Sequence, residues 1–500
     1  MRTTLFTILI SVLLPFTING QTKKISFSSK HSKGITQKNK SLLILWKKVV
    51  FKHHNSIMNC DSASYDRANN SFIAYKNIKI NENDSVHLFG DSLHYYGNEQ
   101  KAYLYGNVKL ITNDIVLKST SLIYDQNYNL AYYYDGGEIK HHSKNYTIKS
   151  KIGKFNTTNN TLYFKKNVAL KHPDYQIISD TLIYQTDNEK TNIIGKTKIE
   201  TKSSKIDCSK GWFDNVKQTS SLKGNVCIET NKYQFFADSV FYNEKIGEAF
   251  AKGDVKIIDD SSSSIIVGQY GYHNEIKDSV RVWESALMIQ YDSIDTMSVY
   301  ADQFIHVNDS VEIKTLCFNN VVIEGTQLNG DCDSIYINEK DSIMKCIINP
   351  IIWIDSNQIT GNEIIFKTYK GIVYNMYIEN DGMVITKKDS NRFDQIKGEQ
   401  LKGYFKNNKL HLLNINENGQ VIYYTQDEET NEIKESNEVT CEKMNIYVDN
   451  NKIRQISFMS KPNGITQPVE LLGKEGNFLD GFRIHTKKSY QEKTAVPKGD

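Results

Sequence analysis

The chain has 500 residues, of which 39% are hydrophobic, six are proline and 30 are tyrosine. Its formal net charge of +3 at pH 7 argues against a nucleic-acid-binding protein with a strongly basic surface. So few prolines exclude a proline-rich linker array, and so many aromatic residues exclude an intrinsically disordered chain. The composition is typical of an ordered protein with extended β-structure and a modest core.

The N-terminus has the pattern of an export signal. Arg2 precedes a short apolar run over residues 5–16, and small or polar residues follow as far as Gly20. This pattern predicts a cleavable signal peptide over residues 1–20. The run is too short to cross a membrane as a helix, which disfavours a membrane anchor. We therefore expect an exported protein, in which residues 21–40, with six lysines among serines and threonines, form a disordered leader.

A repeat of about 30 residues follows the leader. Its first mark is a small residue, and successive small residues are 29 to 33 positions apart until the spacing lengthens near the C-terminus. These residues are Cys60, Gly90, Ser119, Ser150, Ser179, Cys208, Ala237, Gly268, Ala301, Cys332, Gly361, Gly398 and Cys441. In several repeats an Asp-Ser pair follows the small residue and an aromatic residue comes five positions after it. A Gly-Asn-Val sequence such as 106–108 comes later in the repeat. Three marks at one period indicate stacked copies of one structural unit.

Each repeat is predicted to be β-structure, because apolar and polar side chains alternate with a period of two, as in residues 102–110. After the Asp-Ser pair the apolar positions change parity, so the chain must bend or bulge there. Gaps rich in Asn and Gly, such as 97–98 and 159–160, predict turns. The sequence therefore predicts an all-β, elongated repeat protein of about a dozen two-strand units.

The regular repeats are expected over residues 41–360. Beyond Gly361 the spacing lengthens to 37 and then 43 residues, and three of the six prolines lie at or after Pro462. We expect divergent β-repeats or a cap over residues 361–482 and a polar tail over residues 483–500.

The residues that look chemically active have structural explanations. Four of the seven cysteines occupy the small position of the repeat, where a buried thiol fits. The other three, Cys227, Cys317 and Cys346, lack the spacing of a metal site. The pairs 53–54 and 141–142 are adjacent histidines, whose side chains point to opposite faces of a strand. We therefore expect no enzyme, no metal site and no cofactor.

Residues 49–52, residues 58–63 and the repeated Gly-Asn-Val units resemble the OstA-like family. That family includes the periplasmic lipopolysaccharide-transport proteins, and its Bacteroidetes-type members are the most similar. The resemblance, which is clearest over residues 42–360, implies an open, V-shaped β-jellyroll (a "β-taco") whose interior slot holds the acyl chains of lipopolysaccharide. It also implies end-to-end strand pairing with other jellyroll transport proteins in outer-membrane assembly. Only about 100 residues follow Gly398, too few for the barrel of the outer-membrane members, so a soluble bridge fits better.

Thirteen apolar residues are candidates for lining the slot, because their strand positions face inward. They are Ile78, Ile80, Val108, Leu110, Leu117, Val168, Leu170, Ile177, Val226, Ile228, Phe235, Val255 and Ile257. The same residues would equally fill a closed β-core, and the residues alone leave that choice open. The strand that contains Leu45, Val49 and Phe51 is a candidate partner edge, since an unpaired strand can add a strand from another chain.

Two other functions remain open. One is a β-solenoid that binds carbohydrate, and the other is a structural spacer of the cell envelope.

Overall fold

The computed structural model describes residues 24–37, 40–259, 263–291, 296–308, 313–326, 328–369, 372–406, 409–427, 430, 432–449, 452–472 and 477–488. The chain divides into two compact units, an N-terminal unit that ends at Asp187 and a C-terminal unit that begins at Asn188. The signal peptide predicted over residues 1–20 lies outside the described residues. In the described part of the chain, no helix has the length and hydrophobicity that crossing a membrane requires.

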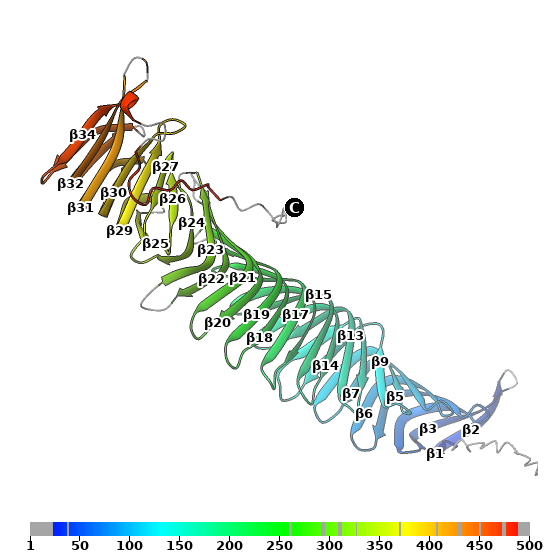
Figure 1. The fold of residues 1–500 in the computed structure, drawn as a ribbon. Coiled ribbons are helices and arrows are strands. Elements are labelled where there is room, and N and C mark those ends of the chain that lie inside the picture. The colour runs from blue at the N-terminus through cyan, green and yellow to red at the C-terminus, as the bar shows by residue number, and fades with distance from the viewer. Residues whose placement is uncertain are drawn as a thin grey trace, which may run out of the picture. The chain divides into compact units, whose positions relative to one another are not determined.

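Both units are built from β-strands that pair in antiparallel fashion (Figure 1), which confirms the predicted all-β repeat fold. The strands of the N-terminal unit are β1 (Ser26–Ser28), β2 (His31–Gln37), β3 (Lys40–His53), β4 (Ser56–Asp66), β5 (Ser71–Glu82), β6 (Val86–Tyr96), β7 (Lys101–Ile111), β8 (Ile115–Asp125), β9 (Leu130–Tyr133), β10 (Gly137–His141), β11 (Thr147–Ser150), β12 (Ile152–Asn156), β13 (Thr161–Lys171) and β14 (Tyr175–Gln185).

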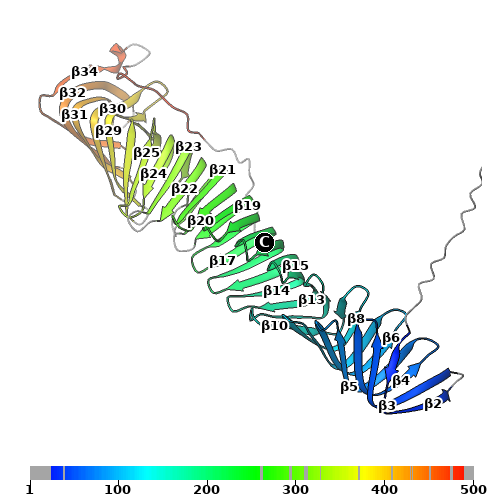
Figure 2. The ribbon, with the colours of Figure 1, turned by 90° about the horizontal axis from the view of Figure 1, so that it is seen from below.

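The C-terminal unit continues the pattern of strands in chain order (Figure 2). Its elements are β15 (Lys190–Thr201), β16 (Ser204–Asp214), β17 (Thr219–Thr230), β18 (Gln234–Asn243), β19 (Glu248–Asp259), β20 (Ser264–Asn274), β21 (Ser279–Tyr291), β22 (Thr296–Asn308), β23 (Ile313–Gly325), β24 (Leu328–Asn338), β25 (Ile343–Ile347), β26 (Ile351–Ile354), β27 (Asn357–Thr360), β28 (Glu363–Tyr369), β29 (Ile372–Lys387), β30 (Phe393–Lys406), β31 (Lys409–Gln426), β32 (Ile433–Asp449), β33 (Lys452–Met459), β34 (Asn463–Pro468) and the 3-10 turn η1 (Val469–Leu471).

Most long strands bend near their middle, at the Asp-Ser step or opposite it. Between β4 and β5 the register runs from Asn59↔Lys79 to Ser62↔Tyr75, so β5 contributes one residue more than β4. The extra residue is accommodated by two successive residues with left-handed backbone, Lys76 (φ 61) and Asn77 (φ 51). This is a β-bulge, and it confirms the predicted bend while placing the inserted residue in the neighbouring strand.

The bulge explains the Gly-Asn motif. Gly106 (φ 72) and Asn107 (φ 44) of β7 have the same left-handed backbone, which glycine and asparagine tolerate better than other residues. The Asp91 carboxylate of β6 accepts a hydrogen bond from Asn107 Nδ2 at 2.8 Å, and Asp61 accepts one from Asn77 Nδ2 at the same distance. Each of these carboxylates thus bonds an asparagine side chain of the neighbouring strand, across the strand pair.

The bend divides each long strand into two halves, and the halves form two facing layers. Arm A contains the half-strands that line up with the β4 residues around Met58, before the small residue Cys60. Arm B contains the half-strands that line up with the β4 residues around Tyr65. The two arms touch in the N-terminal unit, where Phe51 of arm A stacks on Phe72 of arm B with ring centroids 3.8 Å apart. The space between the arms is the interior, and the gap between their hairpin turns is named the mouth.

The prediction of a disordered leader over residues 21–40 is wrong for the described part. Strand β2 pairs with the arm B half of β3, from His31↔Trp46 to Gln37↔Lys40, and β1 pairs with the arm A half. Backbone hydrogen bonds to β3 offset the weak hydrophobicity of these segments.

Strand β3 is therefore not the free edge that was predicted. It is hydrogen-bonded to β4 on one side and to β1 and β2 on the other. Its residues Leu45, Val49 and Phe51 are at most 1% exposed and face the interior. The outermost strands of this unit are β1 and β2.

The C-terminal segment 477–488 is also more ordered than a polar tail. Two buried glutamines hold it, since Gln395 donates to the Asn477 carbonyl (3.0 Å) and accepts from the Leu479 N–H (2.8 Å). Gln358 likewise donates to the Arg483 carbonyl and accepts from the His485 N–H, both at 2.8 Å.

The boundary between the two units falls at Asp187, inside the region predicted as one regular repeat domain, and not at residue 360.

The bulge geometry predicts that Gly106→Ala destabilises the N-terminal unit. A Cβ at Gly106 would lie 2.5 Å from Asp91 Oδ2 on a backbone with φ +72, and a left-handed conformation alone costs about 1–2 kcal/mol. Urea unfolding followed by circular dichroism should show an earlier transition. The control is Gly34→Ala in β2, where a Cβ meets nothing within 4 Å. Equal unfolding midpoints for both variants would contradict this account of the bulge.

Candidate functional site

The interior of the N-terminal unit is filled. Eight of the thirteen candidate slot residues lie in it, and each is at most 2% exposed. They are Ile78, Ile80, Val108, Leu110, Leu117, Val168, Leu170 and Ile177. Large aromatic side chains from arm B, including Tyr95, Tyr124 and Phe155, are equally buried among them. In this unit the candidate residues therefore fill a closed β-core and do not line a slot.

Hydrogen bonds across the mouth close the N-terminal unit. His53 Nδ1, at the tip of arm A, lies 2.6 Å from the Tyr95 hydroxyl of arm B. That hydroxyl donates to Gln126 Oε1 at 2.8 Å, and Gln126 Nε2 donates to Glu82 Oε2 at 2.9 Å. Ser56 bonds Glu82 and Gln126 as well. These five residues, named the latch, join the tips of the two arms.

The latch contains a carboxyl group that is largely removed from water. Glu82 is 7% exposed, and burial raises its pKa although the hydrogen bond from Gln126 opposes the rise. A second contact crosses the mouth farther along the unit, where Lys144 Nζ donates to the Thr186 carbonyl at 3.0 Å and Tyr146 packs edge-on against Tyr184. The latch and these two contacts together cover the apolar core at the mouth.

Over β16–β20 of the C-terminal unit, a row of inward-facing apolar residues is less buried than its counterpart in the N-terminal unit, although Ile257 and Ile266 pack against the neighbouring core. One inward-facing residue from each of these five strands stands opposite the next in register, and each is only partly buried. These residues are Ile206, Ile228, Phe235, Ile257 and Ile266. The row lies on arm A and is named the open groove. It includes three of the predicted slot residues, whereas Val226 and Val255 lie deeper and are 1% exposed.

The facing arm explains why this part is open. In β7 of the N-terminal unit, arm B fills the interior with Leu104, and its neighbour β8 adds Tyr124. In the C-terminal unit the positions that correspond to Leu104 of β7 and Leu122 of β8 hold smaller residues, Ala251 in β19 and Gly271 in β20, while His273 stands where β8 has Tyr124. Less side-chain volume therefore faces the apolar row than in the closed unit.

Beyond β20 the interior closes again. The row continues through Met288, Val299 and Ile323, which are 7%, 1% and 1% exposed. They belong to one apolar core that extends as far as Ile446. The open groove is thus a local feature of five strands.

The outer face of arm B over the same strands is aromatic and cationic. Phe250 and Phe241 are 42% and 41% exposed, and Tyr270 stacks on Trp283 with centroids 5.6 Å apart. The Arg281 guanidinium lies 5.0 Å from the Trp283 ring centroid. Sequence reasoning missed this surface because it weighed the inward positions only, although the alternating aromatics of β19–β21 could have shown it.

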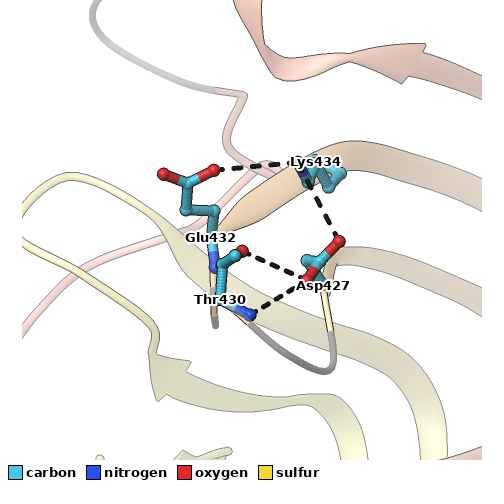
Figure 3. Close-up of polar contacts among 4 residues, drawn as sticks. All are labelled: Asp427, Thr430, Glu432 and Lys434. Atoms are coloured by element: carbon cyan, nitrogen blue, oxygen red, sulfur yellow. Dashed lines mark hydrogen bonds and ion pairs between the residues drawn. The ribbon is translucent and has the colours of Figure 1, made fainter.

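Other polar groups serve the fold. Among the described residues, no three His, Cys, Asp or Glu side chains gather as a metal site would require. Figure 3 shows a polar cluster at the β31–β32 hairpin, where Asp427 Oδ1 accepts hydrogen bonds from the Thr430 N–H (2.9 Å) and hydroxyl (3.1 Å). Lys434 lies 3.7 Å from Glu432 and 4.0 Å from Asp427 at an exposed position. Such contacts are typical of a turn and stabilise little.

Residues 23–180 match the family model described as OstA-like protein. Over these residues the chain is OstA-like. The match covers the closed N-terminal unit, while the open groove at Ile206–Ile266 lies beyond it. The same bulge nevertheless recurs there, since Gly224-Asn225 and Gly253-Asp254 have the same left-handed backbone as Gly106-Asn107.

Twenty-one chains of solved structures match this chain. Among them is LptH from Pseudomonas aeruginosa, the LptA-homologous periplasmic component of its lipopolysaccharide transport device. The two are 16% identical with a TM-score of 0.18, and the match covers 33% of this chain and 92% of LptH. No curated protein matches the sequence.

The latch predicts a pH-dependent stability that Glu82→Gln removes. The raised pKa means that folded protein keeps the Glu82 proton to higher pH than the unfolded chain does. Stability therefore falls as the pH rises from the ordinary glutamate pKa through the raised one. Glutamine keeps an oxygen that accepts the hydrogen bonds of Ser56 and Gln126 but does not titrate. The urea unfolding midpoints of the parent and of Glu82→Gln, measured from pH 4 to 8, should be equal at low pH. At higher pH the midpoint of the parent should fall below that of the variant. Midpoints that change in parallel with pH would refute this role of Glu82.

Proposed function

We propose that the chain is a periplasmic lipopolysaccharide-transport protein that shields acyl chains in the open groove during outer-membrane assembly. The observation that carries this proposal is the combination of an OstA-like segment with a row of half-buried apolar residues in the same repeat pattern. The predicted export signal and the absence of a metal site among the described residues fit such a role.

The open groove has suitable dimensions and chemistry. Five strands spaced about 4.8 Å apart make a row about 19 Å long, which accommodates one acyl chain lying across the strands. Each methylene that leaves water there contributes about 0.8 kcal/mol. Isoleucine and phenylalanine side chains offer no polar group that would need a partner, so the binding depends on hydrophobic burial alone.

The closed N-terminal unit has a different role in this proposal. Its interior is occupied by its own side chains, so it acts as a rigid part of the bridge, with β1 and β2 at its outer edge. Those two strands, and not β3, are the ones that could pair with another jellyroll protein at this end.

Carbohydrate binding is the second candidate function, and the outer face of arm B favours it. Exposed Phe241 and Phe250 with Trp283 and Arg281 offer ring surfaces and hydrogen-bond donors. In that case a sugar without acyl chains would bind, and the open groove would be irrelevant.

Photocrosslinking separates these functions. A photoreactive residue at Ile257 should crosslink to added lipopolysaccharide, because that side chain faces the open groove. The same residue at Lys256, its neighbour on the opposite face of β19, is the matched control and should react several-fold less. A photoreactive residue at Leu110 in the closed unit should also react weakly.

Deacylated lipopolysaccharide provides the competing ligand. It should leave labelling at Ile257 unchanged, because it lacks the acyl chains that the groove holds. Equal labelling at positions 256 and 257 would contradict lipid binding in the groove, and full competition by the deacylated sugar would favour carbohydrate binding.

A further inference from the structure

Residues 477–488 cross five strands of the C-terminal unit and are named the strap. The strap runs from β30 over β29, β27 and β26 to β24, and Figure 1 shows it as the red trace near β26 and β27. None of its residues belongs to a β-strand. Instead, the buried Gln395 and Gln358 side chains each bond one carbonyl and one N–H of its main chain. The protein therefore holds the strap as it would hold a bound peptide.

The floor beneath the strap is the outer face of arm A over β29–β31. Met383, Ile385 and Ile422 point outward there, since Val384, which lies between the first two, belongs to the interior core. These three side chains are at most 4% exposed and form a second apolar cluster with Leu479 of the strap. Strands β29, β30 and β31 pair with one another without any strap residue. The floor thus has its own sheet and its own inner core, so it can keep its shape when the strap leaves.

Two apolar side chains anchor the strap on either side of a tight turn. The Phe482 N–H donates to the Leu479 carbonyl at 3.0 Å, and Gly481 between them has left-handed backbone (φ 83). Leu479 is 9% exposed, and the Phe482 ring centroid lies 5.3 Å from that of Phe393 on β30. The remaining strap residues are exposed or only partly buried. The floor therefore selects an apolar residue, a turn with glycine and an aromatic residue.

The last residue of the strap meets a buried carboxylate that has a partner for one oxygen only. Asp331 of β24 is 5% exposed, and its Oδ1 lies 2.6 Å from Lys488 Nζ. Its Oδ2 is buried and has no hydrogen-bond partner among the described residues. A lysine ammonium is a point charge, whereas a guanidinium offers two parallel N–H groups to the two oxygens of a carboxylate. Asp331 is therefore better suited to an arginine than to the lysine that contacts it.

We propose that the floor is a docking site for a peptide segment of a partner protein, and that the strap covers it as a built-in competitor. The partner segment has an apolar residue, glycine and an aromatic residue in the places of Leu479, Gly481 and Phe482. It has arginine in the place of Lys488. The glutamines bond main chain, which every peptide has, so these four positions provide the selection.

The strap belongs to the same chain as the floor, which gives it a high effective concentration there. Only a segment that binds the floor better than the strap does can displace it. Arginine opposite Asp331 supplies that advantage, because it satisfies the oxygen that Lys488 leaves without a partner. This inference does not depend on lipid binding in the open groove.

Fluorescence anisotropy with synthetic peptides tests the site. The probe is a labelled peptide of residues 477–488 that carries Lys488→Arg. The receptor is full-length Leu479→Asp, in which a carboxylate replaces the buried anchor and the strap leaves the apolar floor. We expect this variant to bind the probe at least tenfold more tightly than the parent does, because the strap of the parent competes. The peptide with lysine at position 488 should bind the variant several-fold more weakly than the probe.

Three further variants serve as controls. Ile484→Asp changes a strap side chain that is 50% exposed, so it should bind the probe as weakly as the parent. Phe482→Ser releases the strap at its other anchor and should bind the probe more tightly than the parent, as Leu479→Asp does. Asp331→Asn, added to Leu479→Asp, should remove the preference for the arginine peptide. Circular dichroism checks that each variant keeps the β-fold.

Two results would overturn the proposal. One is that neither Leu479→Asp nor Phe482→Ser, in folded form, binds the probe more tightly than the parent does. The other is that Ile484→Asp shows the same gain as Leu479→Asp, because the gain would then not come from uncovering the floor. Equal affinity of the arginine and lysine peptides for Leu479→Asp would refute the assignment of arginine to the partner segment.

Discussion

The structure depends on the β-bulge that recurs in nearly every repeat. A strand with one inward face cannot line both sides of an interior unless its backbone is turned over, because a shift by one residue inverts every side chain. Two left-handed residues such as Gly106 and Asn107 make that turn, and the facing Asp91 carboxylate ties it to the neighbouring strand. Both arms can then direct apolar residues into one shared interior, so that a single bent sheet forms both walls.

The bulge creates the two-armed form, but side-chain volume decides whether the interior is closed. Where arm B supplies Tyr95 and Tyr124, the arms are filled and the latch seals the mouth. Where it supplies Ala251 and Gly271, the facing Ile257 and Ile266 remain partly exposed. The same backbone plan therefore yields a filled interior in one unit and a partly exposed apolar row in the other. The five groove residues therefore stay partly in contact with water, at the place where the proposed acyl chain would bind.

The fold could be predicted from the sequence because its signals are local and repeated. The alternation around Val108, the Gly-Asn motif and the small residue at Cys60 each report on a few neighbouring residues. The open or closed state of the interior could not be predicted, because Leu110 and Ile257 have the same pattern in the chain. Their difference arises from the residues that face them across the interior. The pairing of β1 and β2 with β3 was missed for a similar reason, since backbone hydrogen bonds leave no mark in hydrophobicity.

The central claim is that the interior can hold a lipid only where arm B leaves room. The most informative measurement is native mass spectrometry of the full-length protein with lipopolysaccharide. The parent is compared with Ala251→Phe, which fills the groove from arm B. The control is Ser221→Phe, which adds the same ring to the outer face of that arm. We expect the parent and Ser221→Phe to retain bound lipid and Ala251→Phe to lose it. Retention of the lipid by Ala251→Phe at the level of the parent would contradict the account.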